Sequence, residues 1–153
     1  MSQSTQNRYM AEALSEATAA AQRGEIPVGA VIVDGATGEI VARAGNATEA
    51  DQDPTAHAEL LAIRSACAQK GTPRLTDCDL YVTLEPCPMC AAAISFARLR
   101  RIYFGAYDPK GGGVDHGPKI FDQTTCHHKP EAYGGIDEQA AALLLKDFFK
   151  DKR

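Results

Sequence analysis

The sequence contains no run that approaches the roughly 20 consecutive apolar residues needed to cross a bilayer. Its start, residues 1–8, is polar and lacks the apolar segment that directs secretion. We therefore expect no membrane partner and a cytoplasmic location. The chain also has no internal repeat and no low-complexity linker, and 44% of its residues are hydrophobic. These features predict one globular domain over residues 1–153, long enough to bury a core.

The cysteines do not fit a disulfide framework. There are five of them, an odd number, and Cys87 and Cys90 form a Cys-x-x-Cys pair beside proline. In a chain without a secretion signal, this pattern is typical of metal ligation in a reducing compartment. The sequence therefore predicts thiols that are free to bind a metal.

The sequence also lacks a long basic stripe, and its formal net charge is −4. This balance argues against indiscriminate binding of nucleic acid. The charge is uneven, because residues 1–90 hold 6 Lys and Arg against 12 Asp and Glu, whereas residues 91–153 hold 10 against 8. The basic groups gather at residues 98–101 and 150–153. A local phosphate-facing surface is compatible with this pattern, although an ordinary solvated face is the more common reason for such clusters.

Hydrophobic periodicity and turn residues predict alternating strands and helices. Helices are expected at residues 8–22, 55–70, 86–99, 119–123 and 137–150, and strands at residues 28–33, 40–44, 79–84, 102–107 and 131–136. The polar turn between the first two strands indicates a hairpin. The later strands are separated by helices, which is typical of crossover connections. The pattern predicts an α/β sandwich with a mixed sheet.

Two short motifs carry the chemistry: Pro-Thr-Ala-His-Ala-Glu at residues 54–59 and Glu-Pro-Cys-Pro-Met-Cys at residues 85–90. A neutral imidazole and two thiolates are good zinc ligands, so His57, Cys87 and Cys90 are the expected metal ligands. The two cysteines lie at i and i+3 near a helix N-terminus, whose partial positive charge favours thiolates. Three protein ligands leave a position open for water, and Glu59 is the expected proton carrier for that water.

Other interpretations of these motifs remain open. A closed structural zinc site needs a fourth ligand, and the candidates are Cys67, Cys78, Cys126, His116, His127 and His128. Glu85 competes with Glu59 for the proton-carrying role because it precedes the helix that carries the two cysteines. Residues two apart on a regular helix point in nearly opposite directions, so His57 and Glu59 share a site only if His57 lies at a frayed first turn.

His-x-Glu at the start of one helix and Pro-Cys-x-x-Cys at the start of another are the signature of zinc nucleobase deaminases. The chain resembles the cytidine deaminase-like superfamily and, within it, is similar to the bacterial tRNA-specific adenosine deaminases over nearly its whole length. The matching segments are residues 27–30, Asn46, residues 53–59 and 80–87, residues 104–106 with Asp108 and Lys110, and the Phe148-Phe149 pair before the basic tail. Residues 111–134 depart from the form common in that family.

This resemblance implies a three-layer α/β/α sandwich of the cytidine deaminase-like kind, built around a five-stranded mixed sheet. It implies a homodimer with one Zn²⁺ per subunit. The implied reaction is hydrolytic deamination of adenosine to inosine at the wobble position of a tRNA anticodon stem-loop. The zinc ligands and Glu59 keep the roles inferred from the motifs. Four further residues would contact the substrate by resemblance: Asn46, Asp108, Lys110 and Phe149.

Two other functions remain open at this point. The acidic net charge and the missing basic stripe favour the same chemistry on a free base or nucleoside, such as guanine or cytosine. A noncatalytic zinc module that binds RNA or a partner would require four protein ligands on the metal. The substrate and the ligand count therefore decide among the three interpretations.

Overall fold

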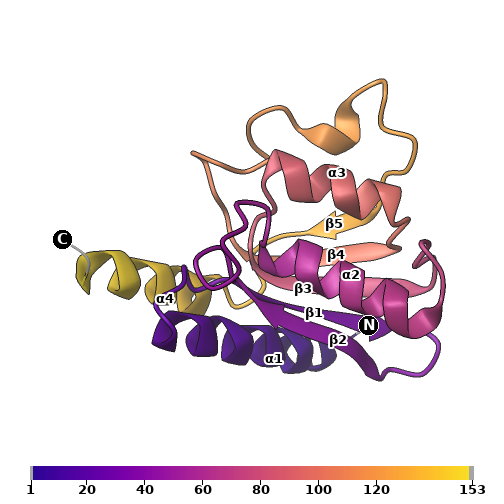
Figure 1. The fold of residues 1–153 in the computed structure, drawn as a ribbon. Helices are drawn as coiled ribbons and strands as arrows, with labels where there is room; N and C mark the ends of the chain where they lie inside the picture. Colours follow the sequence, from indigo (N-terminus) through magenta and orange to yellow (C-terminus); the bar gives the residue numbers. More distant parts are fainter. Residues whose placement is uncertain (1, 152–153) are drawn as a thin grey trace.

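The computed structural model describes residues 2–151, in which a five-stranded sheet carries helices on both faces. The helices are α1 (Gln3–Gln22), α2 (Ala58–Lys70), α3 (Pro88–Phe96) and α4 (Glu138–Asp151), with a short 3₁₀ helix, η1 (Ile120–Asp122). The strands are β1 (Gly29–Asp34), β2 (Ile40–Gly45), β3 (Cys78–Leu84), β4 (Arg101–Ala106) and β5 (Glu131–Tyr133). Figure 1 shows α1 and α4 on one face of the sheet and α2 and α3 on the other. The expected three-layer α/β/α sandwich is confirmed.

The sheet is mixed, with the strand order β2-β1-β3-β4-β5. β1 pairs antiparallel with β2 and β3, whereas β3, β4 and β5 run parallel. Gly45 pairs with Gly29, and Ala30 pairs with Val82, so β2 and β3 end at the same edge of the sheet. The connections after these two strands lead into α2 and α3. The N-termini of both helices therefore lie at that edge.

Several element bounds differ from those predicted. α1 begins at Gln3, because the Ser2 side chain accepts a backbone hydrogen bond and caps the helix five residues before the predicted start. α2 begins at Ala58 and α3 at Pro88, so Pro86 does not occupy the first helical position as predicted; Pro88 does. The segments predicted at residues 119–123 and 131–136 shorten to η1 and β5. Within residues 2–151, no helix combines the length and apolar character needed to span a membrane.

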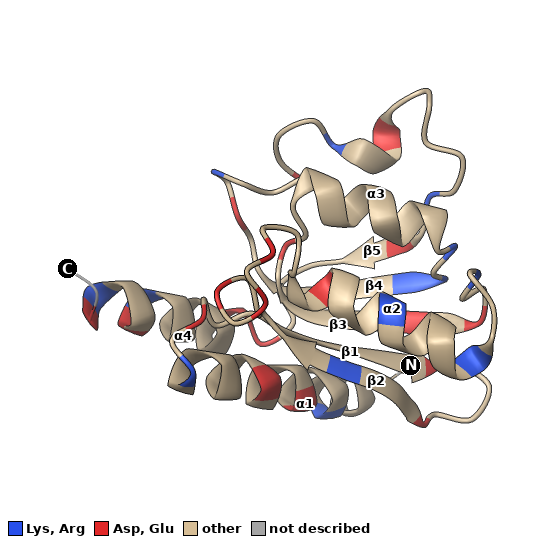
Figure 2. Cartoon of the chain, viewed as in Figure 1, with Lys and Arg blue, Asp and Glu red and all other residues tan. Residues whose placement is uncertain are grey.

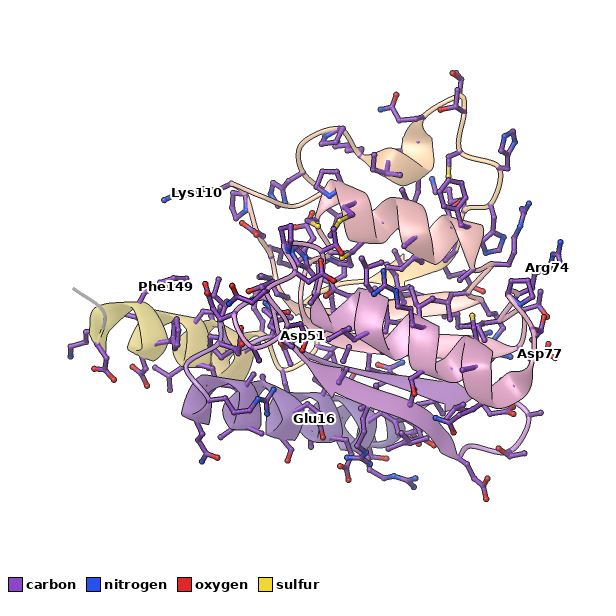
Figure 3. The ribbon with its side chains drawn as sticks, viewed as in Figure 1. Glu16, Asp51, Arg74, Asp77, Lys110 and Phe149 are labelled. Carbon is purple, nitrogen blue, oxygen red and sulfur yellow. The ribbon has the colours of Figure 1, made fainter. Side chains whose placement is uncertain are left out.

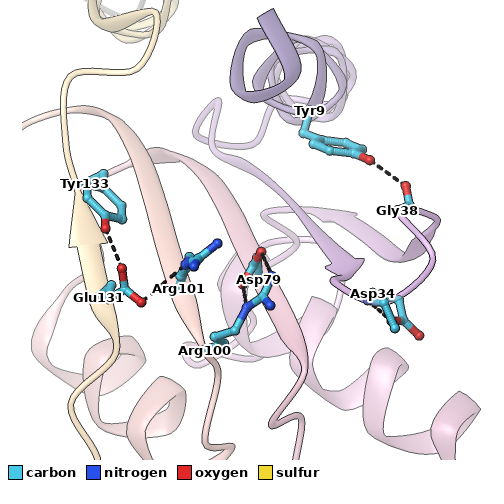
Figure 4. A network of polar contacts seen from close by, with 9 residues as sticks. Tyr9, Asp34, Gly38, Asp79, Arg100, Arg101, Glu131 and Tyr133 are labelled. Carbon is cyan, nitrogen blue, oxygen red and sulfur yellow. Dashed lines mark hydrogen bonds and ion pairs between the residues drawn. The ribbon is translucent and has the colours of Figure 1, made fainter. Parts of the chain in front are cut away.

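Alternate residues of the central strands build two different cores. Leu80 and Val82 of β3 belong to the aliphatic core beneath α2 and α3. Tyr81 faces the α1 side, where its ring stacks on that of Tyr103 with centroids 4.5 Å apart. Tyr9 of α1 packs against Tyr81, and its hydroxyl donates to the Gly38 carbonyl at 2.5 Å (Figure 4). Packing on both faces therefore holds the helices against the sheet.

Ion pairs tie the strand starts together at the opposite edge of the sheet. Arg100 donates hydrogen bonds of 3.0 and 2.8 Å to the two carboxylate oxygens of buried Asp79 (Figure 4). Arg101 pairs with Glu131 at 3.3 Å. The basic cluster at residues 98–101 is thus engaged in intramolecular contacts, away from the N-termini of α2 and α3. Of the second basic cluster, residues 152–153 lie outside the described residues.

Candidate active site

The N-termini of α2 and α3 bring the two sequence motifs together. His57 is the N-cap of α2 and Cys87 is the N-cap of α3, and both have an extended backbone. Nδ1 of His57 lies 3.6 Å from Sγ of Cys87 and 3.6 Å from Sγ of Cys90. All three potential ligand atoms lie within 4.8 Å of one another. The structure therefore gathers the three residues that the motifs single out.

This spacing suits a zinc ion. Zn–S bonds of about 2.3 Å and a Zn–N bond of about 2.0–2.1 Å, set at a tetrahedral angle, separate nitrogen from sulfur by about 3.6 Å. The two nitrogen-to-sulfur distances of 3.6 Å match that value. Among residues 2–151, no other His, Cys, Asp or Glu joins the group. The donor set fits a metal with three protein ligands, which leaves room for an exchangeable fourth.

The remaining cysteines and histidines make other contacts. Cys78 belongs to the aliphatic core, and half-buried Cys67 and Cys126 pack against it. Nε2 of His128 donates to the Leu99 carbonyl at 2.6 Å. Across the described part of the chain, none of the six fourth-ligand candidates reaches the group formed by His57 and the two cysteines of the motif. A closed structural zinc site thus has no support from these residues.

Contact between the two thiols prepares them to bind a metal. The Cys90 side chain donates to the Cys87 sulfur and, helped by the backbone N–H of Cys90, lowers the pKa of Cys87 to about 5. The same contact, together with burial, raises the pKa of Cys90. The contact therefore favours the thiolate form of Cys87, and Cys90 gives up its proton when a metal binds.

Glu59 lies beside this group in the first turn of α2, with only 4% of its surface exposed. Burial, with a smaller contribution from the Cys87 charge, raises the pKa of Glu59 to about 7. The ψ angle of 150° at His57 places that residue outside the regular helix, so the two side chains reach one site despite their spacing of two. A carboxyl group with a pKa near neutrality both accepts and releases protons under physiological conditions.

The connection between β2 and α2 is held by two buried polar side chains. Oδ1 of Asn46 accepts a hydrogen bond of 2.8 Å from the backbone N–H of Ala58, which orients the carboxamide NH₂ away from that contact. Glu25, which the sequence analysis missed, accepts hydrogen bonds from the backbone N–H groups of Glu49 and Ala50 at 3.2 and 2.8 Å. The signal for Glu25 was a charged residue four positions before the start of a buried strand.

The other expected substrate contacts come from different elements. Asp108 follows β4, and its Oδ1 accepts two backbone hydrogen bonds of 3.2 and 2.9 Å from its own turn. Lys110 is exposed, and Phe149 on α4 is 46% exposed. Figure 3 shows Lys110 and Phe149 toward one end of the molecule, and Arg74 and Asp77 toward the other. Asp108, Lys110 and Phe149 are not among the three potential metal ligands.

Residues 3–106 match the family model described as the cytidine and deoxycytidylate deaminase zinc-binding region. The chain belongs to this deaminase family. Its cofactor is zinc, in agreement with the donor set of His57 and the two cysteines. The chain is 54% identical to the tRNA-specific adenosine deaminase of Agrobacterium fabrum (strain C58) over 145 residues, which cover 95% of this chain and 94% of that relative.

Two solved structures illustrate the range of similar proteins. One comes from a study of A-to-I editing by tRNA:A34 deaminases at the wobble position of transfer RNA. That structure is 54% identical to this chain in sequence and has a TM-score of 0.88. The match covers 90% of this chain and 99% of the other. The other is a guanine deaminase from Bacillus subtilis, with 42% identity and a TM-score of 0.62, covering 65% of this chain and 63% of its own. The cytidine deaminase-like fold is confirmed.

Replacement of Cys87 by Ala is expected to abolish stoichiometric zinc binding, because it removes one of three ligand atoms from the group. Cys67→Ala is the matched control, since Cys67 is a half-buried thiol on α2 that packs against the aliphatic core and should leave the zinc content unchanged. Atomic emission measurements on both purified variants give the metal content. One zinc per chain in Cys87→Ala would show that the metal is held by other residues.

Proposed function

We propose that this protein converts adenosine to inosine at the wobble position of tRNA anticodons by zinc-dependent hydrolysis, with release of ammonia. The observation that carries this proposal is the 54% identity, over nearly the whole of both chains, to a tRNA-specific adenosine deaminase. All five cysteines of the chain are free thiols, which agrees with a reducing, cytoplasmic location.

In the proposed mechanism, His57, Cys87 and Cys90 hold the zinc ion. Zinc, when bound, lowers the pKa of a water ligand from about 15.7 to about 7, which supplies a nucleophile at neutral pH. Glu59 accepts a proton from the attacking water and delivers it to the purine ring nitrogen next to C6. Glu59 then takes the second proton of that water from the new hydroxyl on C6 and delivers it to the departing amino group, so that adenosine and water become inosine and ammonia.

The environments of the two acidic candidates support Glu59 over Glu85 as the proton carrier. Both Glu85 oxygens accept hydrogen bonds from the backbone at residues 108 and 114–116. Burial alone would raise the pKa of Glu85, but these bonds and one from the His116 imidazole outweigh it and lower the pKa. A carboxylate with its oxygens occupied in this way is a poor carrier, whereas buried Glu59 has a pKa near 7.

Glu59→Gln is expected to keep stoichiometric zinc and to lower kcat by about 10²-fold or more, because the amide cannot accept the proton of the attacking water. Glu49→Gln, an exposed substitution in the β2–α2 connection, serves as the control and should retain the parent rate. Single-turnover ammonia release and metal analysis on the same samples provide the measurement. Near-normal turnover in Glu59→Gln would remove this residue from the mechanism.

The proposal assigns substrate contacts to four side chains. Asn46 presents its carboxamide beside the start of α2, where it would contact the target nucleotide. Asp108, Lys110 and Phe149 would contact the anticodon stem-loop around that nucleotide. Figure 2 shows one basic position on the ribbon of the connection after β4, basic positions toward the C-terminal end of α4, and acidic positions along the connection that precedes α2. The basic groups suit phosphates, although the net charge of −4 limits nonspecific binding.

A tRNA with adenosine at the wobble position is expected to gain inosine at that position when incubated with the zinc-loaded protein. Free guanine is the matched alternative substrate, because a guanine deaminase resembles part of this chain. Sequencing of the tRNA and ammonia detection with guanine separate the two activities. Release of ammonia from guanine with no inosine in the tRNA would reverse the assignment in favour of a free-base deaminase.

The proposal includes a homodimer, for which the end of α3 offers an apolar surface. Phe96 is 78% exposed there, the largest exposed fraction among the large hydrophobic side chains of residues 2–151. Beside Phe96, residues of α3, of η1 and of the segment that follows η1 line a cavity of about 240 Å³. A large aromatic ring next to an apolar hollow is typical of a surface that packs against another copy.

Phe96→Glu is expected to convert the dimer into a monomer, because it places a charge in an apolar contact. Leu143→Glu is the matched control, since Leu143 is 56% exposed on α4, on the other face of the sheet. Sedimentation velocity over a range of concentrations measures the mass of each variant. A parent protein that sediments as a monomer at micromolar concentration would contradict the homodimer.

A further inference from the structure

Glu85 is a buried carboxylate two residues before the zinc motif's first cysteine, and it organises a distant segment of the chain. Its Oε1 accepts a hydrogen bond of 3.0 Å from the backbone N–H of Asp108. Its Oε2 accepts three more, from the backbone N–H groups of Val114, Asp115 and His116, at 3.2, 2.9 and 3.1 Å. Both ends of the loop formed by residues 108–116, the 108–116 loop, therefore attach to one side chain.

His116 completes this attachment with its own side chain. Nδ1 of the imidazole donates to Oε1 of Glu85 at 2.8 Å, so the residue contacts the carboxylate through both its backbone and its ring. The imidazole ring also meets the ring of Tyr107, with centroids 6.2 Å apart in an edge-on arrangement.

The interior of the 108–116 loop is also tightly built around Glu85. A side chain at Gly112 would bring its Cβ within 2.4 Å of Oε2 of Glu85, so only glycine fits there. The backbone N–H of Gly113 donates to the carbonyl of Pro86 at 2.8 Å. The loop is thus bonded to the two residues that precede Cys87, and its first turn carries Asp108 and Lys110.

We propose that Glu85 and His116 act as a clamp that positions the 108–116 loop for binding of the RNA substrate. The clamp rests on the proposed function. Its residues are positioning residues, because they act on the substrate through Asp108 and Lys110 and take no part in proton transfer. Hydrogen bonds to a charged acceptor contribute more than those to a neutral one, and the loop depends on five of them.

Three variants of the full-length, zinc-loaded protein test the clamp. His116→Ala removes the imidazole donor, whereas His116→Asn keeps a side-chain N–H at nearly the position of Nδ1. Asp122→Asn is the matched control, because it removes an exposed ion pair with Lys129 from the same stretch of chain. Each variant is assayed for kcat and KM with the tRNA, for zinc content, and for hydrogen exchange of the loop amides.

His116→Ala is expected to raise KM for the tRNA by roughly tenfold, because loss of one hydrogen bond to a charged group weakens binding by about that factor. kcat should change by less than about twofold, and one zinc per chain should remain, because the metal ligands and Glu59 are untouched. The amides of Asp108, Val114 and Asp115 should exchange faster than in the parent. His116→Asn should recover most of the KM and the slow exchange, and Asp122→Asn should match the parent.

Unchanged KM and unchanged amide exchange in His116→Ala would overturn the clamp. A loss of zinc or a fall in kcat with constant KM would also overturn it, because the pair would then support the metal-ligating helix instead of the substrate loop. A parent protein that leaves the tRNA unmodified would contradict the proposed function. In that case, faster exchange in His116→Ala would still support the clamp as a structural contact and reject its role in RNA binding.

Discussion

The meeting of two helix N-termini at one edge of the sheet is the constraint on which the rest of this structure depends. Because β1 runs antiparallel to both β2 and β3, those two strands end at the same edge, and the connections after them enter α2 and α3 there. His57 and Cys87 occupy the N-cap positions, with extended backbones that aim their side chains toward each other. The partial positive charge at the start of α3 favours the thiolates that a metal requires.

Three buried glutamates near this edge show how environment assigns different roles to one side chain. Glu25 and Glu85 each accept several backbone hydrogen bonds, which hold a loop in place. Glu59 is equally buried but lies among the metal-ligating groups, and desolvation raises its pKa to about 7. A carboxyl group with such a pKa is suited to proton transfer, whereas a fully hydrogen-bonded carboxylate is suited to holding backbone in place.

The metal-ligating group and the stabilising ion pairs lie at opposite edges of the sheet. The arginines at positions 100 and 101 pair with acidic residues at the strand starts, which ties β3, β4 and β5 together. The opposite edge carries the metal-ligating group, the connection that holds Asn46, and the 108–116 loop. This separation allows the loops that meet a substrate to vary while the packing beneath them is kept, and relatives with the same fold include proteins described by different substrates.

Local sequence patterns predicted the residues of the zinc motif, the α/β class, and the order of strands and helices. Those features depend on local spacing and on periodicity over a few residues, which can be read along the chain. The tertiary structure alone decided that Glu25 holds the connection before α2, that Glu85 gathers four backbone N–H groups, and that Pro88 rather than Pro86 starts α3. Each of these depends on backbone conformation or on contacts between segments more than twenty residues apart. Residue spacing carries no signal for such contacts, because strand order and the path of the loops determine which distant groups meet.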